Sequence, residues 1–247
     1  MNAGYDFGYS WSIQYGALVP LVLAVSAAAV AHWRGWRWMS WLSGAVALWA
    51  LAALLLVHVA LGINRPVAIP TERFLASGSG RVLDAGAGSG RAAIGVLLAR
   101  PHATVVGLDL YDGYYGIDGN TPERFMANAR VAGVAGRAEA RRGDMRRLPF
   151  DNASFDAVVS AYALDHLRGR DSATALGEAA RVIRPGGELL LLNVNPDWIA
   201  WVSSPHAVAH HPRPDRDAWR TRLQQSGFTI EDEGTAPATW YVLARRR

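Results

Sequence analysis

Cysteine and lysine are both missing from this chain of 247 residues. Without cysteine there is no disulfide framework, no thiolate metal site and no cysteine nucleophile. Without lysine the positive charge rests on arginine alone. A formal net charge of +4, carried by scattered arginines, is too small to indicate nucleic-acid binding. The spacing of His206, His210 and His211 supplies no convincing ligand set, so we expect no metal site.

Charged residues are also missing from two long N-terminal segments, at about residues 15–33 and 38–63. Each is long enough to cross the hydrocarbon core of a bilayer as a helix. A signal peptide is disfavoured because no basic residue precedes the first segment and a longer apolar run follows it. A buried hairpin of a soluble protein is disfavoured by the length of the second run. The sequence therefore predicts a membrane hairpin in residues 1–63, with a tryptophan-rich turn typical of the membrane interface, formed by Trp33, Trp36, Trp38 and Trp41.

The pattern changes after the hairpin. Residues 64–80 read as a proline-punctuated linker and a short helix that leads into a domain covering residues 81–247. Strand-like and helix-like segments alternate there, which predicts an α/β fold with a parallel sheet and helices on both faces. Thr121 followed by Pro122 is a strong signal for the start of a helix.

A glycine-rich turn, "RVLDAGAGSG" (81–90), follows the first strand of this domain. Glycines at such a turn let backbone amides approach a ligand that a Cβ atom would exclude. A dinucleotide-binding turn would place its third glycine where this chain has Arg91. Asp109 ends the second strand, where such folds hold ribose hydroxyls with an acid. The spacing therefore points to a nucleoside cofactor other than a nicotinamide dinucleotide.

Together with "GDMRRLPFDNASFDAVVS" and "RVIRPGGELLL", this turn resembles class I S-adenosylmethionine-dependent methyltransferases, notably the methyltransferase-11 and ubiquinone/menaquinone-type branches. The resemblance covers roughly residues 71–247 and leaves the hairpin outside. It implies S-adenosyl-L-methionine as cofactor and a Rossmann-like seven-stranded sheet of order 3-2-1-4-5-7-6, with strand seven antiparallel.

The resemblance also implies which residues bind the cofactor. Asp84 would lie at the amino group of the methionine portion, Asp109 at the ribose hydroxyls and Asp144 at the adenine amino group. Each of these acids could instead cap a helix or begin a turn. The remaining implied contacts come from the glycine turn, the neighbours of the adenine and the end of the fourth strand: Gly86, Gly88, Gly90, Leu110, Met145 and Ala161.

The segment "AYALDHL" (161–167) follows the fourth strand, where the methyl donor and its acceptor should meet. His166 has a suitable ordinary pKa for a general base, with Asp165 beside it. Tyr162 and Tyr115 are expected to orient the acceptor. The alternative is that Asp165 and His166 open or cap the next helix. Two aromatic segments, 111–120 and 195–214, are expected to cover the site.

These features leave three hypotheses for function. The favoured one is a membrane-anchored methyltransferase acting on a lipid-soluble or membrane-associated acceptor. The same enzyme could act on a small diffusible nucleophile, with the hairpin serving only location or oligomerisation. A non-catalytic cofactor-binding membrane protein is the third. Because the cofactor is cytosolic, we expect an integral protein of the cell membrane with its catalytic domain and both ends in the cytoplasm.

Overall fold

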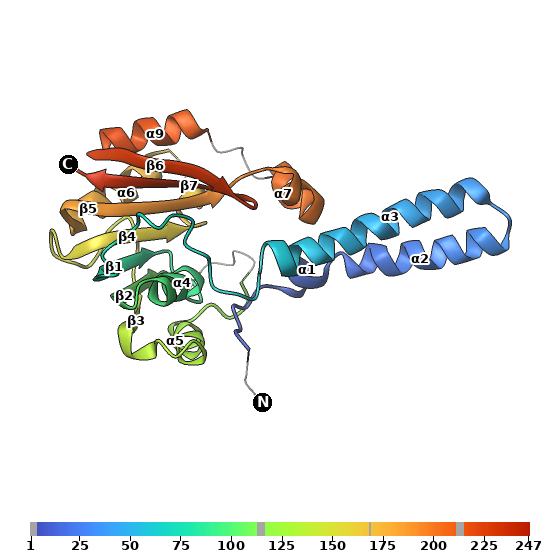
Figure 1. Ribbon diagram of the computed structural model, residues 1–247, viewed down its shortest axis with the longest axis horizontal. Coiled ribbons are helices and arrows are strands. Elements are labelled where there is room, and N and C mark those ends of the chain that lie inside the picture. Colours follow the sequence, from blue (N-terminus) through green and yellow to red (C-terminus); the bar gives the residue numbers. More distant parts are fainter. Residues whose placement is uncertain (1–3, 113–116, 168, 211–214) are drawn as a thin grey trace.

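Two long helices form a hairpin that projects from the rest of the chain (Figure 1). The first arm consists of α1 (Trp11–Tyr15) and α2 (Leu18–Trp33). The second consists of α3 (Arg37–Leu55) and its wider final turn η1 (Leu56–Ala60), so it ends at Ala60 rather than at residue 63. The structure, a computed structural model, describes residues 4–112, 117–167, 169–210 and 215–247.

Both arms, Trp11–Trp33 and Arg37–Ala60, are long and apolar enough to cross a membrane. Within the most apolar 18 residues of each arm, only 6% are buried in the first arm and 17% in the second. Large side chains such as Leu23 and Leu48 are 65% and 70% exposed. A core helix of a soluble domain would be mostly buried, so the hairpin instead presents an apolar surface to its surroundings. The arms pack through small buried residues, which let two helices approach closely: Ala24, Ala31, Ala50 and Ala53.

The rest of the chain is built on a seven-stranded sheet of order β3-β2-β1-β4-β5-β7-β6. Strands β1 to β5 run parallel where they pair, and β7 is antiparallel to both of its neighbours. The predicted strand order and the antiparallel seventh strand are confirmed. The strands are β1 (Ser79–Ala85), β2 (His102–Asp109), β3 (Ala138–Arg142), β4 (Phe155–Ala161), β5 (Ile183–Val194), β6 (Phe228–Ala236) and β7 (Thr239–Arg246).

Helices cover both faces of this sheet because successive strand residues point to opposite sides. Along β1, Val82 packs into one core and Leu83 into the other. The first core is covered by α4 (Arg91–Ala99) and α5 (Pro122–Val131), and the second by α6 (Arg170–Val182) and α9 (Arg216–Gln225). The start of α5 is as predicted, since Thr121 Oγ1 accepts from the Arg124 amide at 3.2 Å. Short elements complete the domain: η2 (Ala135–Arg137), η3 (Leu164–His166), α7 (Trp198–Ser203) and α8 (Pro205–His210).

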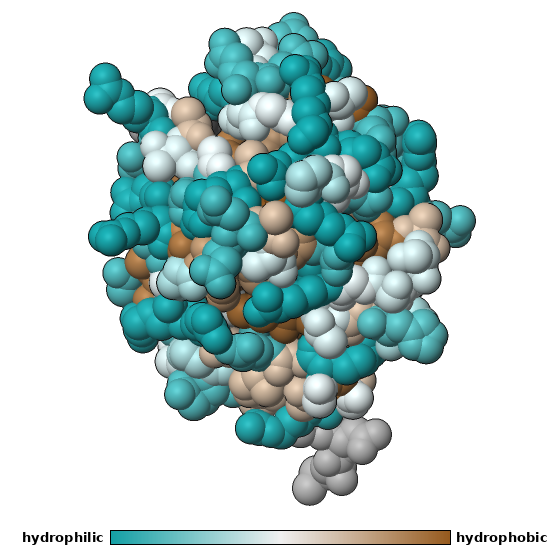
Figure 2. All heavy atoms as spheres, turned by 90° about the vertical axis from the view of Figure 1, so that its left-hand side faces the viewer, coloured by the Kyte–Doolittle hydropathy of each residue, from teal (hydrophilic) through white to brown (hydrophobic). Residues whose placement is uncertain are grey.

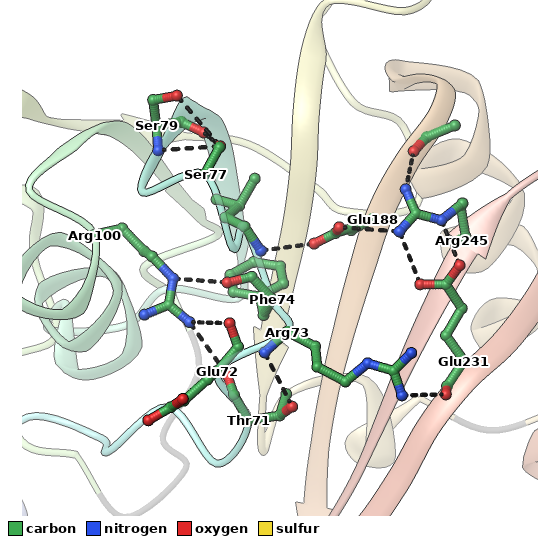
Figure 3. Close-up of polar contacts among 12 residues, drawn as sticks. Thr71, Glu72, Arg73, Phe74, Ser77, Ser79, Arg100, Glu188, Glu231 and Arg245 are labelled. Atoms are coloured by element: carbon green, nitrogen blue, oxygen red, sulfur yellow. Dashed lines mark hydrogen bonds and ion pairs between the residues drawn. The ribbon is translucent and has the colours of Figure 1, made fainter.

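The linker differs from the prediction. Residues 72–77 form turns instead of a helix, and polar contacts bind them to the domain (Figure 3). Arg100 donates to the carbonyl oxygens of Phe74 at 2.6 Å and Thr71 at 3.2 Å. Glu188 on β5 accepts from the Leu75 amide at 2.7 Å. Side chains that are distant in the sequence thus form hydrogen bonds with the backbone of these turns, so the segment is part of the domain rather than a free connection.

The carboxyl ends of the parallel strands face the base of the hairpin (Figure 1). Helix α7, which follows β5, contacts both α3 and η1 there. The opposite face of the domain carries mostly hydrophilic side chains (Figure 2). The apolar hairpin and the carboxyl edge of the sheet therefore lie on the same side of the molecule.

Candidate active site at the carboxyl edge of the sheet

A cavity of about 310 Å³ lies at the carboxyl ends of β1, β2 and β4. In a parallel α/β sheet this edge is where ligands bind. The cavity brings together nine residues predicted from the sequence: Gly86, Gly88, Asp109, Leu110, Asp144, Met145, Ala161, Tyr162 and His166.

The backbone geometry of this turn requires glycine. Gly86, Gly88 and Gly90 have φ angles of 84°, 49° and 90°, in the left-handed region that favours glycine. A Cβ atom on Gly86 would lie 2.3 Å from the Cβ atom of Ala163, across the cavity mouth. Gly90 is not on the cavity wall and instead begins α4, where a Cβ atom would lie 2.8 Å from Phe125. Two of the glycines thus shape the cavity and the third shapes the helix behind it.

Asp109 organises the floor of the cavity. Its carboxylate accepts from the amides of Gly88 and Tyr111, both at 2.9 Å, and from Asn120 Nδ2 at 3.4 Å. The Oδ1 atom of Asn120 is buried on the same wall without a hydrogen-bond partner among the described residues. A buried acceptor of this kind is costly unless a ligand satisfies it. Asn120 and Asp109 together form a pair of acceptors suited to ligand hydroxyl groups.

The first aromatic segment, 111–120, is only partly described. Asn120 belongs to this segment, and no sequence signal distinguishes it from its neighbours. Tyr115, predicted to orient the acceptor, lies outside the described residues. Of the three histidines considered above, His211 and the side chains of His206 and His210 lie outside them as well. Among the residues the structure describes, no group of three His, Asp or Glu could hold a metal ion.

Asp84 lies behind the glycine turn, not on the cavity wall, and its predicted contact with the cofactor remains a prediction. It is fully buried, and Oδ2 accepts from the Ala93 amide in α4 at 2.8 Å. The pKa of the Asp84 carboxyl is raised to about 7, mainly by burial and to a smaller extent by the nearby charge of Asp109, while the hydrogen bond from the Ala93 amide lowers it. Its structural role is to connect β1 to the first turn of α4.

Asp144 lies on the cavity wall, but Arg146 engages its carboxylate. The guanidinium donates to Asp144 at 2.7 and 3.0 Å and also reaches Asp171 on α6 at 2.8 Å. These hydrogen bonds hold the pKa of Asp144 below its ordinary value. The predicted contact with an adenine amino group remains a prediction, in which Asp144 would accept from both partners.

Tyr162, at the end of β4, has a left-handed backbone with φ of 54°. Its hydroxyl lies 2.6 Å from Thr239 Oγ1, and burial raises the pKa of Tyr162, so the hydroxyl keeps its proton.

His166 is on the cavity wall, in the 3₁₀ turn η3. Asp165 is not on that wall, and both carboxylate oxygens are buried without hydrogen-bond partners among the described residues. The predicted catalytic role of Asp165 therefore remains a prediction.

The N-terminal segment also reaches the cavity, which the sequence did not indicate. Phe7 is buried, and its carbonyl oxygen accepts from Ser89 Oγ at 2.8 Å. Tyr9 lines the cavity next to Arg91. The Arg91 guanidinium donates to the carbonyl oxygens of Leu61 at 2.8 Å and of Gly62 at 3.0 Å. The residue that replaces the third glycine of a dinucleotide site thus joins the glycine turn to the end of the hairpin.

Comparison with known proteins agrees with this geometry. Residues 82–187 match the methyltransferase domain family. A ubiquinone/menaquinone biosynthesis C-methyltransferase of Syntrophotalea carbinolica is 33% identical over 135 residues, which is 54% of this chain and 52% of that protein. A demethylmenaquinone methyltransferase of Deinococcus radiodurans is 34% identical over 122 residues, 49% of this chain and 46% of that protein. The chain spans about half the length of these curated relatives.

Solved structures share the fold. A putative S-adenosyl-L-methionine-dependent methyltransferase from Methanococcus maripaludis superposes with a TM-score of 0.53 at 17% identity, covering 68% of this chain and 78% of that one. The hairpin lies outside the segment that matches the domain family.

Proposed function

We propose that this chain, whose residues 82–187 match the methyltransferase domain family, is a membrane-anchored class I S-adenosylmethionine-dependent methyltransferase acting on a lipid-soluble acceptor. The observation that carries the proposal is the place of the hairpin. Its exposed apolar arms start from the same edge of the sheet that holds the cavity (Figure 1). An acceptor dissolved in the bilayer would reach this edge without passing through water. The names of the relatives, which refer to ubiquinone and menaquinone biosynthesis, support such an acceptor.

The cavity fits S-adenosylmethionine, which supplies a methyl group bonded to a positively charged sulfur. A Cβ atom on Gly86 would close the cradle that the glycine turn leaves open for the methionine portion. Asp109 and the unpartnered Oδ1 atom of Asn120 would accept from ribose hydroxyls. Leu110, which is 37% exposed on the same wall, would lie beside the adenine.

The chain's own residues would align the acceptor, exclude water and remove a proton. The acceptor's nucleophilic atom bonds to the methyl carbon while the carbon–sulfur bond breaks, and that electron pair remains on sulfur. Where the nucleophile carries a proton, His166 is the base on the cavity wall. Tyr162 would orient the acceptor by a hydrogen bond rather than act as a base, because burial keeps its hydroxyl protonated. Tyr9, which lines the cavity, would help to exclude water.

Methyl transfer is tested with the full chain in detergent or vesicles, using methyl-labelled S-adenosylmethionine and a total membrane lipid extract. We expect label in material that partitions into organic solvent, and its loss in an Asp109→Ala variant. Label confined to water-soluble products would instead support the diffusible acceptor. Absence of any transfer, with cofactor binding intact, would favour a non-catalytic binding protein.

Topology is tested by introducing single cysteines, since the chain has none. Arg34→Cys reports on the hairpin turn, and Gly136→Cys reports on the catalytic domain, where a side chain meets open space. We propose that both ends of the hairpin are cytoplasmic. The turn should then be labelled from outside the cell, and the domain only after permeabilisation. Release of the protein by carbonate, or labelling of the turn only from inside, would contradict two spans.

A further inference from the structure

A second cavity, of about 480 Å³, lies between the base of the hairpin and the catalytic domain. One wall is the last turn of the second arm and the residues after it, 59–63. The opposite wall is the carboxyl end of β5, at Leu192 and Val194, with the turn 236–239 between β6 and β7. Helix α7 contributes Ala200 from the side. The cavity thus exists only because the hairpin packs against the sheet edge.

This cavity adjoins the cofactor cavity. Tyr9, Val67, Arg91 and Tyr162 line both. Two ligands held on either side of shared side chains lie close enough to react after small side-chain movements, and methyl transfer needs the reacting atoms about 3–3.5 Å apart. The position is therefore that of an acceptor site facing the methyl donor.

The chemistry of the walls selects the acceptor. Among the described lining residues there is no carboxylate, and the arginines are Arg65 and Arg91. The Arg91 guanidinium is engaged by hairpin carbonyl oxygens, as described above. A cationic amine would find no counter-charge in such a cavity, whereas an uncharged apolar molecule would replace water at little cost. At the inner end, the hydroxyl groups of Tyr162 and Thr239 lie 2.6 Å apart and can orient one polar group of the acceptor.

The outer end of the cavity opens at the hairpin. Val59 lines the cavity and is also 68% exposed on the second arm. Helix α7 packs beside the same arm (Figure 1), and it carries Trp198 and Trp201, which are 67% and 41% exposed. Tryptophans in such a place are typical of the membrane interface. The opening is therefore at the level where the apolar arm leaves the domain.

We propose that this cavity binds the methyl acceptor, an uncharged lipid-soluble molecule, and that the hairpin forms its membrane-side wall and its entrance from the bilayer. This inference rests on the proposed function and extends it. The hairpin is then a part of the active site and not only an anchor. Its last turn decides which acceptors reach the methyl donor.

The test narrows the cavity from two sides. Ala60→Trp adds a large side chain at the hairpin wall, at an exposed position that tolerates it, and Ser203→Phe does so from α7. The matched control is Ala45→Trp, an exposed alanine on the same arm outside the cavity. Activity is measured with labelled cofactor and the lipid extract, and calorimetry with S-adenosylhomocysteine checks the cofactor cavity.

We expect both narrowing variants to lower kcat/KM for the lipid acceptor by about tenfold or more, with unchanged S-adenosylhomocysteine affinity and wild-type behaviour of the control. Wild-type kcat/KM in both narrowing variants, with lipid still methylated, would overturn the inference and leave the proposed function standing. A wild-type chain that labels no lipid would overturn the proposed function itself.

A second measurement needs no activity. The full chain in phosphatidylcholine vesicles is irradiated with a long-chain alcohol that carries a diazirine, and cross-linked peptides are mapped by mass spectrometry. We expect cross-links at Leu192 and Val194, which are strand residues inside the cavity, and fewer of them in Ala60→Trp. Cross-links restricted to α2 and α3 would overturn the inference.

Discussion

Replacement of Gly86 by alanine should damage both stability and cofactor binding. At φ of 84°, a residue with a Cβ atom carries a backbone cost of about 1–2 kcal/mol. The new methyl group would also lie 2.3 Å from Ala163 Cβ and 2.9 Å from Met145 Cε. Met145 can rotate away, but Ala163 Cβ is fixed to the main chain, so the turn after β4 must shift. Overpacking of this kind costs about 1–3 kcal/mol.

The two costs together predict a loss of about 2–5 kcal/mol, which for a domain of this size lowers Tm by roughly 4–20 °C. Thermal unfolding of the full chain, followed by tryptophan fluorescence, measures it. Because the shifted turn is a wall of the cofactor cavity, S-adenosylhomocysteine should also raise the Tm of Gly86→Ala less than that of the wild type.

Two glycine variants serve as controls. Gly88 has φ of 49°, but a Cβ atom there would meet Ile117 at an ordinary 3.5 Å, so Gly88→Ala should show the backbone cost alone. Gly177 lies exposed within α6 with open space around it, and Gly177→Ala should be stabilising by about 0.5–1 kcal/mol. If Gly86→Ala has the same Tm as Gly88→Ala, the steric argument is wrong. If Gly86→Ala has the Tm of the wild type and binds S-adenosylhomocysteine with wild-type affinity, the whole account of the turn is wrong.

Three further outcomes are expected. Asp109→Ala removes the acceptor for the amides of Gly88 and Tyr111, and S-adenosylhomocysteine affinity should fall about tenfold or more by calorimetry; equal affinity would refute the assignment. The pKa of Asp84 is about 7 in the folded chain and 3.8 as its ordinary value, so the native state binds more protons between these limits and stability falls as pH rises through them. Asp84→Asn should remove this pH dependence of stability. If denaturant titrations at pH 4.5 to 8 give the same difference in unfolding free energy between variant and wild type at every pH, the role assigned to Asp84 is wrong. His166→Ala should lower turnover by about 10²–10⁴-fold with cofactor affinity intact, and wild-type turnover would leave alignment and water exclusion as the source of catalysis.

The elements of the catalytic domain were predictable because their signals are local. Thr121 and Pro122 predict the start of α5, and the alternation of strand and helix patterns predicts a parallel sheet. The strand order came from the resemblance of the glycine turn and its companion segments, and the structure has that order. Local patterns were less reliable at boundaries. The run "PGG" is typical of a turn, yet it lies within β5, which begins at Ile183.

Positions of side chains at the site were predictable only in part. Gly86, Gly88 and Asp109 line the cavity because the turn that carries them is set by short-range geometry. Asp84 and Asp165 do not, because the direction of each side chain depends on what packs above it. For Asp84 that is the first turn of α4, whose Ala93 amide draws the carboxylate behind the turn.

The hairpin, the class of the domain and the glycine turn can all be identified from sequence, because each depends on a continuous stretch of residues. The contact between the hairpin and the turn depends on the tertiary structure. Tyr9 lies 82 residues before Arg91 in the chain, and their side chains share the wall between two cavities. No periodicity or spacing encodes such a contact. It arises because folding brings the end of the hairpin onto the carboxyl edge of the sheet, where the Arg91 guanidinium satisfies the carbonyl oxygens at which the helix stops.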